Sequence, residues 1–535
     1  MDMRPVQKRS YPPDRWTAMT GMCIAAGLVW LAFADFAVTV PTISRELAVS
    51  LPQLQWANNA FSLTAGALVL AAGRQGDVFG HKKMLETGLV GFGVLSLIAV
   101  VTPGMTGLII GRALMGVAAA LILPATLALI PAMFPVAEHA RAFGAWMVVA
   151  WVGQGMGPAV GGVLTSALGW RSTFWINAPL ALAALYLVRR SAIESIDPNA
   201  SRHLDMGGLT TSALAAFCLL YGLTEGQERG FGDPLVLVLL AASIVLAGGF
   251  VWLEKRLSDP LLDMHLFSSR PFCGALVANT VLNAVFAGLS FLLSLYLQEV
   301  RGYSALTAGL LLLPSTVTIL LCTPIGGRIA AKHAARLPVV AGLLLTGVGT
   351  LLTGTLLHAY SYALIALGLL ILGTGLGLMS IPLSDTAVAG PPMEVAGMAS
   401  GMFKVTSMLG GAFGVAALAA VRHTVESQAV HHAQATGLSK SESDILRDAV
   451  SDSRLLSQVE SSLDQATRAA VTEAYHRVET VGCGVAILVA GATAVVASAT
   501  LPLLWRLPGK PQPHRDGEES GEVTRHQDSN GRQET

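Results

Sequence analysis

Residues 73–83 read GRQGDVFGHKK, and this short polar stretch separates two long apolar blocks at residues 54–73 and 84–102. Each block has about twenty residues, the length that a helix needs to cross the hydrocarbon core of a bilayer. Glycines within the stretch permit a tight turn, and the two lysines at its end favour the inner membrane surface. The stretch therefore predicts two membrane-spanning helices joined by a short cytoplasmic loop.

The same alternation of apolar blocks and short polar stretches continues along the chain. Of its 535 residues, 53% are hydrophobic and only 13% are charged, whereas an ordinary soluble domain has about a quarter charged. Blocks this long indicate helices and not barrel strands. We therefore expect an all-α integral membrane protein with about 14 transmembrane helices. The candidate spans are residues 17–40, 54–73, 84–102, 107–131, 143–167, 173–189, 206–224, 234–254, 274–297, 305–325, 337–357, 361–382, 398–420 and 480–505.

The composition also argues against several other classes of protein. The formal net charge is zero, so no basic field favours nucleic acid. The five cysteines stand singly inside apolar segments, where small packing residues are expected. The spans contain no Ser/His/Asp, metal-ligand or cysteine-nucleophile arrangement, and GxxxxGK[ST] does not occur in the sequence. We therefore expect neither an enzyme, nor an ATP-driven pump, nor a metal site.

Positive charges are distributed unequally between alternate loops. On the side of the N-terminal tail they are frequent, whereas the opposite short loops hold only Arg45, Arg171, Arg229 and Arg301. Because positively charged loops stay in the cytoplasm, the asymmetry predicts that both termini are cytoplasmic and that the number of spans is even.

A degraded copy of the first stretch, GRIAAKHAAR at residues 327–336, indicates an internal repeat. The copies fall at equivalent places if two six-helix halves flank two extra helices. The predicted domains are a cytoplasmic tail (1–16), a six-helix bundle (17–190), two inserted transmembrane helices with linkers (191–270), a second six-helix bundle (271–505) and a disordered cytoplasmic tail (506–535).

Within the second bundle, residues 422–477 are polar and carry a recurring apolar set, which predicts helices on the outer face. We interpret them as a solvated lid or spacer and not as a binding domain. The apolar set is Leu446, Val450, Leu455, Leu456, Val459 and Leu463.

Two charged residues are predicted to lie deep in the first bundle, Asp35 in the first span and Arg112 in the fourth. Both lie about five residues from the outer membrane face, or roughly 8 Å, so a pair between them is possible. One hypothesis is a proton site, because apolar surroundings favour the neutral carboxyl while a nearby arginine favours the charged one. The other is a static ion pair at a helix end. We favour the first, since charges inside a membrane are rarely kept for stability.

Other charged residues near helix ends are weaker candidates for function. Asp385 and Lys404 are expected near cytoplasmic helix ends, and Glu225 near an outer one. At such positions side chains are usually solvated or reach back to the membrane surface.

The fifth span contains GQGMGPAVGG at residues 153–162, with glycines at four-residue spacing and a proline. Small residues at this spacing let helices pack closely. Proline beside glycines also makes a helix bendable, which plain packing does not need. The residues that carry this pattern are Gly153, Gly157, Pro158, Gly161 and Gly162.

Together these stretches resemble the fourteen-helix drug:proton antiporter family of the major facilitator superfamily, which includes actinomycete antibiotic exporters. The resemblance covers residues 15–505 and includes LQW at 54–56, Trp170-Arg171, Asn177, Pro179 and GMASG at 397–401. Residues 73–83 resemble the signature loop of the superfamily, which implies a conformational latch formed by Gly73, Asp77, Gly80, Lys82 and Lys83. Residues 153–162 resemble the antiporter signature of its exporting members.

Two positions depart from the family pattern. The acid of the first helix usually stands nine residues before the proline, where this chain has Ala32, so Asp35 is one turn later. Met115 replaces the glutamine that usually follows the arginine of the fourth span. The second departure removes one polar group from the expected proton site.

The resemblance implies a plasma-membrane exporter that works by alternating access, with the proton gradient as its energy source and no bound cofactor. Its expected partners are a drug-like, amphipathic small molecule, protons and the lipid bilayer, and we expect a monomer. Export of an endogenous metabolite or siderophore, or a non-transporting membrane sensor with the same fold, remains an alternative. Residues that could line the cavity, or else bond a neighbouring helix, are Trp30, Asn58, Asn59, Phe61, Asn279, Asn283 and Tyr296.

Overall fold

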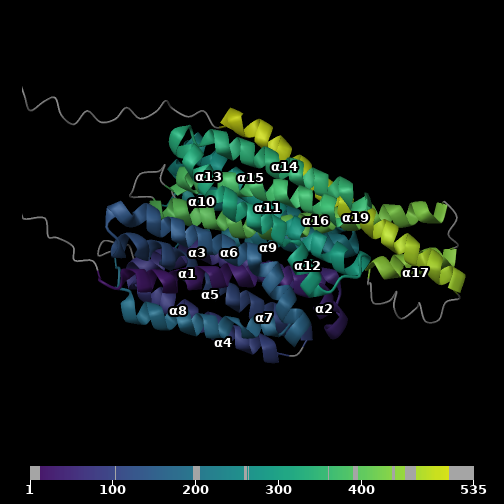
Figure 1. The fold of residues 1–535 in the computed structure, drawn as a ribbon, viewed down its shortest axis with the longest axis horizontal. Coiled ribbons are helices and arrows are strands. Elements are labelled where there is room, and N and C mark those ends of the chain that lie inside the picture. The colour runs from purple at the N-terminus through teal and green to yellow at the C-terminus, as the bar shows by residue number, and fades with distance from the viewer. Residues whose placement is uncertain are drawn as a thin grey trace, which may run out of the picture. The chain divides into compact units, whose positions relative to one another are not determined.

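The computed structural model describes residues 12–102, 104–196, 205–257, 262, 264–359, 361–388, 396–435, 440–451 and 465–504. Within these ranges every regular element is a helix and no strand occurs. The helices run side by side, joined by short connections (Figure 1). The all-α prediction is confirmed.

The first eight helices pack mainly against one another, with α1 against α6 and α8, and α5 against α3 and α4. We call them the N-terminal bundle. Their bounds are α1 (Arg15–Ala34), α2 (Phe36–Leu47), α3 (Leu51–Phe79), α4 (His81–Val101), α5 (Gly104–Met133), α6 (Val136–Leu168), α7 (Ser172–Trp175) and α8 (Asn177–Ser191).

The helices from α11 onward form a second group, which we call the C-terminal bundle, with α14 against α15 and α19, and α11 against α16. The bounds are η1 (Met264–Ser268), α11 (Arg270–Leu295), η2 (Tyr296–Val300), α12 (Ala305–Leu311), α13 (Leu313–Lys332), α14 (Arg336–Leu356), η3 (Leu357–Ala359), α15 (Tyr362–Val388), α16 (Ala396–Ala435), α17 (Lys440–Ser451) and α19 (Gln465–Leu504). One hydrophobic core of buried side chains continues through both bundles.

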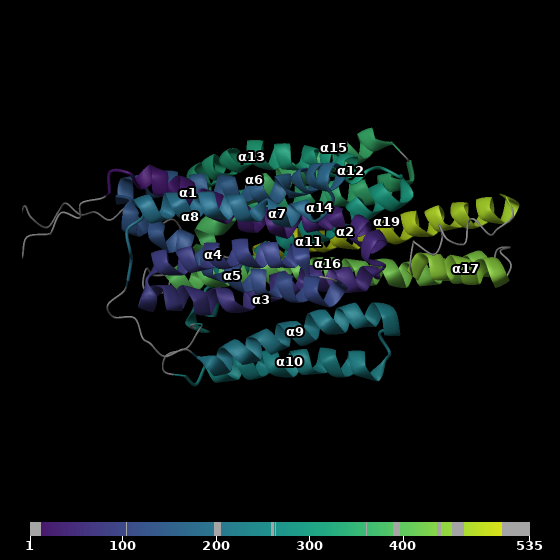
Figure 2. The same ribbon diagram turned by 90° about the horizontal axis from the view of Figure 1, so that it is seen from below.

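Between the bundles in sequence lie α9 (Met206–Arg229) and α10 (Pro234–Glu254), which form a hairpin beside α3 (Figure 2). Each helix begins with an aspartate cap: Asp205 accepts a hydrogen bond from the Gly208 N–H at 2.8 Å, and Asp233 accepts one from the Leu235 N–H at 2.8 Å. Helix α9 contacts α3 and also α16, so it touches both bundles.

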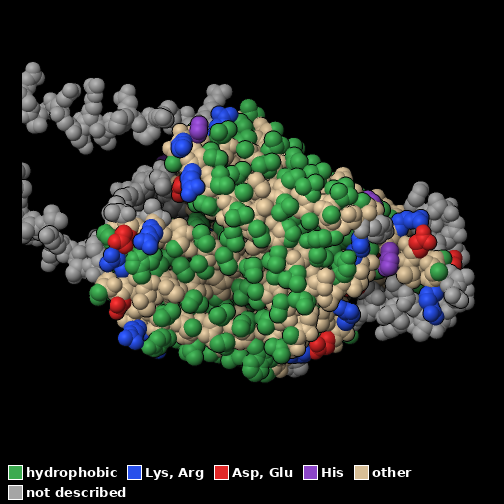
Figure 3. Space-filling view, in the orientation of Figure 1, with side chains coloured by type: hydrophobic (Ala, Val, Ile, Leu, Met, Phe, Trp, Pro, Cys, Tyr) green, Lys and Arg blue, Asp and Glu red, His purple; other side chains and the backbone are tan. Residues whose placement is uncertain are grey.

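The surface is that of a membrane protein. Hydrophobic side chains cover the middle of the face seen in Figure 3, and charged side chains gather towards the two ends of the helices. Among the described residues, twelve helical segments are long and apolar enough to cross a membrane. Helices α3 and α8 match two further predicted spans but are not among these twelve segments.

The polar segment 422–477 contains helices, as expected, but two of them, α16 and α19, are continuous with the spans. Helices α16 and α19 extend past the other helices at one end, where α17 packs against them (Figures 1 and 2). Val430, Leu446 and Tyr475 belong to a small separate core there. The predicted positions Leu455, Leu456, Val459 and Leu463 lie outside the described residues.

Next to this small core, a buried cluster of charged side chains links α16 to α19. Arg422 forms ion pairs with Glu426 at 2.5 Å and with Glu479 at 2.7 Å.

Candidate functional site

Asp35 lies at the junction of α1 and α2, where the first predicted span is interrupted. Its side chain is buried, and its Oδ2 atom has no hydrogen-bond partner among the residues that the structure describes. A buried carboxylate oxygen without a donor is costly while the carboxylate is charged. The position therefore suits a group that gains and loses a proton.

Arg112 on α5 is brought to the same region, but it is bonded to other groups. It donates from Nη1 to the Ala32 carbonyl at 2.7 Å and from Nη2 to the Asn58 side-chain oxygen at 3.3 Å. Its guanidinium lies 4.6 Å from the ring centres of both Phe36 and Phe61. Within the described part of the chain, no ion pair of 4.0 Å or less joins it to Asp35. Arg112 thus holds the α1–α2 corner and leaves the acid free of a salt bridge.

One face of α6 packs directly on α1 through the glycines spaced by four. A Cβ atom added at Gly157 would lie 2.5 Å from the Ala34 Cβ, and one at Gly161 would lie 2.8 Å from the Asp35 carbonyl. Gly153 meets the Gly27 carbonyl in the same way. The glycines are required by close approach, and they place the GQGMGPAVGG segment against the buried acid.

A second face of α6 packs on the C-terminal bundle. The Thr316 hydroxyl donates to the Gly155 carbonyl at 2.6 Å, and the Leu306 N–H donates to the Ser166 hydroxyl at 2.9 Å. Any side chain at Gly162 would clash with the Ala305 carbonyl. The same glycine-rich segment therefore packs both on α1 and on the other bundle.

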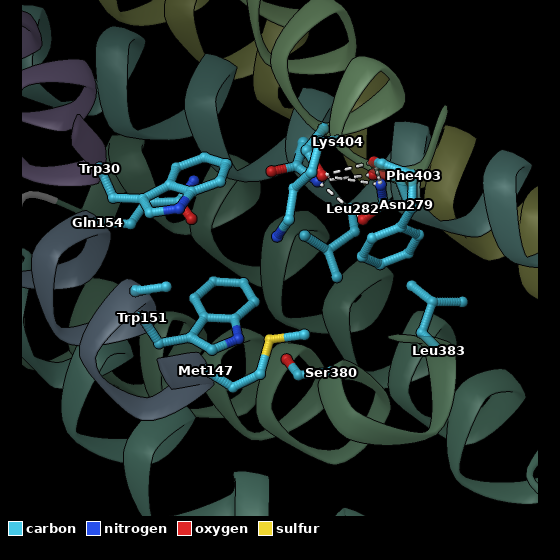
Figure 4. Close-up of a pocket in the computed structure, with 13 residues that line it drawn as sticks. Trp30, Met147, Trp151, Gln154, Asn279, Leu282, Ser380, Leu383, Phe403 and Lys404 are labelled. Carbon is cyan, nitrogen blue, oxygen red and sulfur yellow. Dashed lines mark hydrogen bonds between the residues drawn. The ribbon is translucent and has the colours of Figure 1, made fainter. Parts of the chain in front are cut away.

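A cavity of about 40 Å³ lies between the two bundles (Figure 4). This volume holds about three water molecules, because the centre of each water needs roughly 10–15 Å³ of free space. Along α6 the lining residues, from Met147 to Gln154, precede the contacts of Gly155 to Ser166 with the other bundle. The bundles are therefore in contact on the side of the cavity towards the C-terminal end of α6.

The thirteen lining residues come from five helices. They are Trp30 from α1, Met147, Ala150, Trp151 and Gln154 from α6, Asn279, Leu282 and Asn283 from α11, Ser380 and Leu383 from α15, and Phe403, Lys404 and Ser407 from α16.

The residues suggested by the sequence for the cavity fall into three groups. Trp30, Asn279 and Asn283 line it, and the Asn279 amide also donates to the Phe403 carbonyl at 2.8 Å. Asn58 and Phe61 contact Arg112 instead. Asn59 is buried, and the Tyr296 hydroxyl donates to the Leu357 carbonyl at 3.0 Å.

Lys404 is the polar residue whose environment the sequence did not indicate. It was expected near a helix end in contact with water, but its side chain is 6% exposed and lines the cavity. A lysine eight residues into α16 could lie at the membrane surface or inside, depending on which helices cover it. Its neighbour one turn on, Ser407, also lines the cavity, and this polar spacing on an apolar helix was the available signal.

The stretch 73–83 is mostly helical, which differs from the predicted loop. Helix α3 continues to Phe79, and only Gly80, with a φ of 104°, separates it from α4. The Asp77 carboxylate lies 2.9 Å from the His81 ring nitrogen Nε2. Polar residues such as Arg74, Gln75 and Asp77 can continue a helix beyond the bilayer, so the end of the apolar block did not mark the end of the helix.

Comparisons with known proteins agree with this architecture. A model of the Major Facilitator Superfamily matches residues 22–415. The chain is 30% identical over 403 residues to the tetracenomycin C resistance and export protein of Streptomyces glaucescens, with 75% of each chain covered. It is 33% identical to the multidrug resistance protein Stp of Mycobacterium tuberculosis, covering 74% of this chain and 75% of that one. It is 31% identical to the quinolone resistance protein NorB of Staphylococcus aureus, covering 75% and 87%.

Solved structures are similar in fold at lower sequence identity. A bacterial homologue of the human lysosomal transporter Spinster, in an inward-facing and unoccupied conformation, aligns with a TM-score of 0.62 at 16% identity, covering 93% of this chain and 99% of that one. The POT family transporter PepTSo aligns with a TM-score of 0.60 at 14% identity, covering 92% of this chain and 99% of that one.

Proposed function

Because this chain belongs to the Major Facilitator Superfamily, we propose that it exports amphipathic, drug-like small molecules in exchange for protons by alternating access. It is a multi-pass membrane transporter and not an enzyme, and its relatives at about 30% identity are antibiotic and multidrug exporters. The relatives support export as the direction of transport. The GQGMGPAVGG segment supports it too, since the signature that it resembles is typical of exporting members.

The observation that carries the proton-coupling proposal is the environment of Asp35. Its carboxylate is buried, lacks a partner at Oδ2, and is backed by the glycine face of α6, which also contacts the other bundle. A proton can neutralise this acid, and a shift of α6 relative to α1 changes its surroundings. Arg112, held at the Ala32 carbonyl, is the cation that such a shift would move towards the acid or away from it.

The packing of the bundles supports alternating access around the central cavity. With both termini cytoplasmic, the contacts of Gly155 to Ser166 with α12 and α13 lie towards the outer surface. Release of a substrate outward would then require these contacts to open. We propose further that residues 73–83 act as a latch on the cytoplasmic side and that the protein works as a monomer.

The test is uptake into energised inverted membrane vesicles, measured for a panel of lipophilic dyes and antibiotics with and without a protonophore. We expect Asp35→Asn to lower the gradient-driven initial rate at least about tenfold, a loss of about 1.4 kcal/mol of transition-state stabilisation. Asp35→Glu should keep part of the rate because it keeps an ionisable group. The matched control is Asp385→Asn, since Asp385 is an exposed carboxylate on α15.

The outcomes separate the parts of the proposal. Gradient-driven uptake that survives Asp35→Asn keeps the antiporter but moves the proton site to another residue. Uptake that the protonophore leaves unchanged contradicts proton coupling itself.

A further inference from the structure

The central cavity contains a buried lysine without a counter-ion. Lys404 makes no hydrogen bond or ion pair with any described residue, and only 6% of its surface is exposed. Its Nζ atom lies 4.4 Å from the ring centre of Trp146, 5.6 Å from that of Trp30 and 5.7 Å from that of Phe403. Figure 4 shows the amine directed into the cavity. Aromatic faces stabilise a cation, but they do not supply the opposite charge.

Two further donors face the same cavity without a partner. The Trp30 Nε1 and Gln154 Nε2 atoms are buried and make no hydrogen bond within the described ranges, and both residues line the cavity with Lys404. The other two amides of the lining differ, since Asn279 donates to the Phe403 carbonyl and Asn283 to the Asn279 carbonyl. The two fully buried polar atoms of the lining that lack a partner within the described ranges are thus both N–H donors.

The lining offers these donors no carboxylate. Its thirteen residues include neither aspartate nor glutamate. Burial of an ammonium group or an N–H donor without a partner is unfavourable. An oxyanion that entered the cavity would satisfy all three groups together, whereas a cation would meet a like charge at Lys404.

The apolar part of the lining indicates the rest of the ligand. Trp30, Trp151 and Phe403 present aromatic surface around the donors (Figure 4). Flat aromatic rings pack against such surfaces in offset or edge-to-face arrangements.

We propose that the cavity recognises substrates that carry an oxyanion on a flat aromatic body, with Lys404 as the charge partner and Gln154 and Trp30 as additional donors. This inference rests on the proposed export function and names the substrate class of the same site. The bundles must separate to admit such a molecule, because the cavity has room for only a few waters.

The test is equilibrium binding to the full-length chain in lipid nanodiscs, followed by quenching of tryptophan fluorescence. The probes are anthraquinone-2-carboxylate and its neutral analogue anthraquinone-2-carboxamide. We expect Lys404→Met to weaken binding of the carboxylate by about 10-fold to 100-fold, and binding of the amide by less than about 3-fold. Lys404→Arg should keep the preference for the carboxylate. Lys332→Met, which removes an exposed lysine from the last turn of α13, should change neither affinity.

Three results would overturn the inference. In the first, the wild-type protein binds the amide as tightly as the carboxylate, or binds neither probe. In the second, Lys404→Met weakens binding of both probes equally. In the third, Lys404→Met leaves binding of the carboxylate unchanged. Binding needs no gradient, so these results are independent of the Asp35 experiment. Gradient-driven export without carboxylate preference would reject only the substrate class, and selective binding without any export would reject only the proposed function.

Discussion

Lys82 joins the beginning of α4 to the end of α8. Its Nζ atom donates to the carbonyl of Arg189 at 3.1 Å and to that of Ala192 at 2.7 Å. Carbonyls at the C-terminal end of a helix lack partners within the helix and favour a cation. The neighbouring Lys83 is exposed. The two adjacent lysines of the 73–83 stretch therefore have different roles.

We predict that Lys82→Met destabilises the protein and that Lys83→Met does not. The first change removes two charge-assisted hydrogen bonds, for which we expect about 1–2 kcal/mol after allowing for partial exposure. The measurement is the melting temperature of each purified variant in nanodiscs, where only Lys82→Met should lower it by a few degrees. Equal melting temperatures for both variants would mean that the bonds of Lys82 add nothing measurable.

Single residues differed in how far the sequence could predict them. Asp35 and Arg112 stand out because a charge inside an apolar block needs a reason, and the structure places both in the buried core. Their mutual geometry could not be predicted, since the partners of Arg112 at Ala32 and Asn58 depend on how three helices pack. Lys404 was named as a weaker candidate near a helix end, and its burial could not be predicted because other helices of the bundles produce it.

Helix α6 is one of the elements on which the two bundles meet, and α3, which packs on α16, is another. Its glycines at 153, 157 and 161 face α1, while Gly155 and Gly162 face α12 and α13. A helix with small residues on two faces can lie close to two neighbours at once. Asp35 lies against the first face and the C-terminal bundle against the second. A movement of α6 would therefore change the contacts of both.

We predict that Gly157→Val reduces export while the protein still inserts into the membrane. The new side chain would press on Ala34 and on the Asp35 backbone, and overpacking of this kind costs about 1–3 kcal/mol. The matched control is Gly144→Val on the same helix, where a Cβ would meet nothing within 4 Å. Export rates in vesicles, normalised to protein in the membrane, should fall only for Gly157→Val. Normal export by that variant would remove the role given to the glycine face.

Most helices could be predicted from the sequence, and the errors lie where polar residues continue a helix. Length and hydropathy gave a helix for every predicted span because backbone groups in lipid must bond within their own segment. The first span is interrupted at Asp35, and α16 continues to Ala435, far past its apolar block. Where water can solvate the backbone, hydropathy no longer marks the helix end.

At the scale of the whole molecule, one set of contacts joins the two bundles on one side of the cavity. Besides the α6 contacts, the Gln298 amide donates to the Val38 carbonyl at 3.1 Å, which links η2 to α2. The contacts of α6 with α12 and α13 lie towards its C-terminal end. An exporter has to break them once in each cycle.

We predict that a covalent link across this contact stops transport. In the double variant Ser166→Cys and Leu306→Cys, the new thiols replace the residues of the 2.9 Å hydrogen bond. Oxidation should cross-link them and abolish export, and a reducing agent should restore it. Each single variant under the same oxidant is the control. Full export by a cross-linked protein, verified by mass spectrometry, would show that the contact need not open.

Helix α9 lies over the junction of α3 and α16, where Leu220 packs with Leu63, Ala412 and Ala416. The junction of α6 and α13 instead carries exposed apolar side chains, among them Val163, Val317 and Leu321. The hairpin of α9 and α10 thus covers the junction between the two bundles on one side of the transporter. We expect the hairpin to hinder entry of a lipophilic molecule from the bilayer at the junction of α3 and α16, and to leave the junction of α6 and α13 uncovered. In a transporter of this architecture, the position of the hairpin would then determine from which side a substrate dissolved in the membrane can enter.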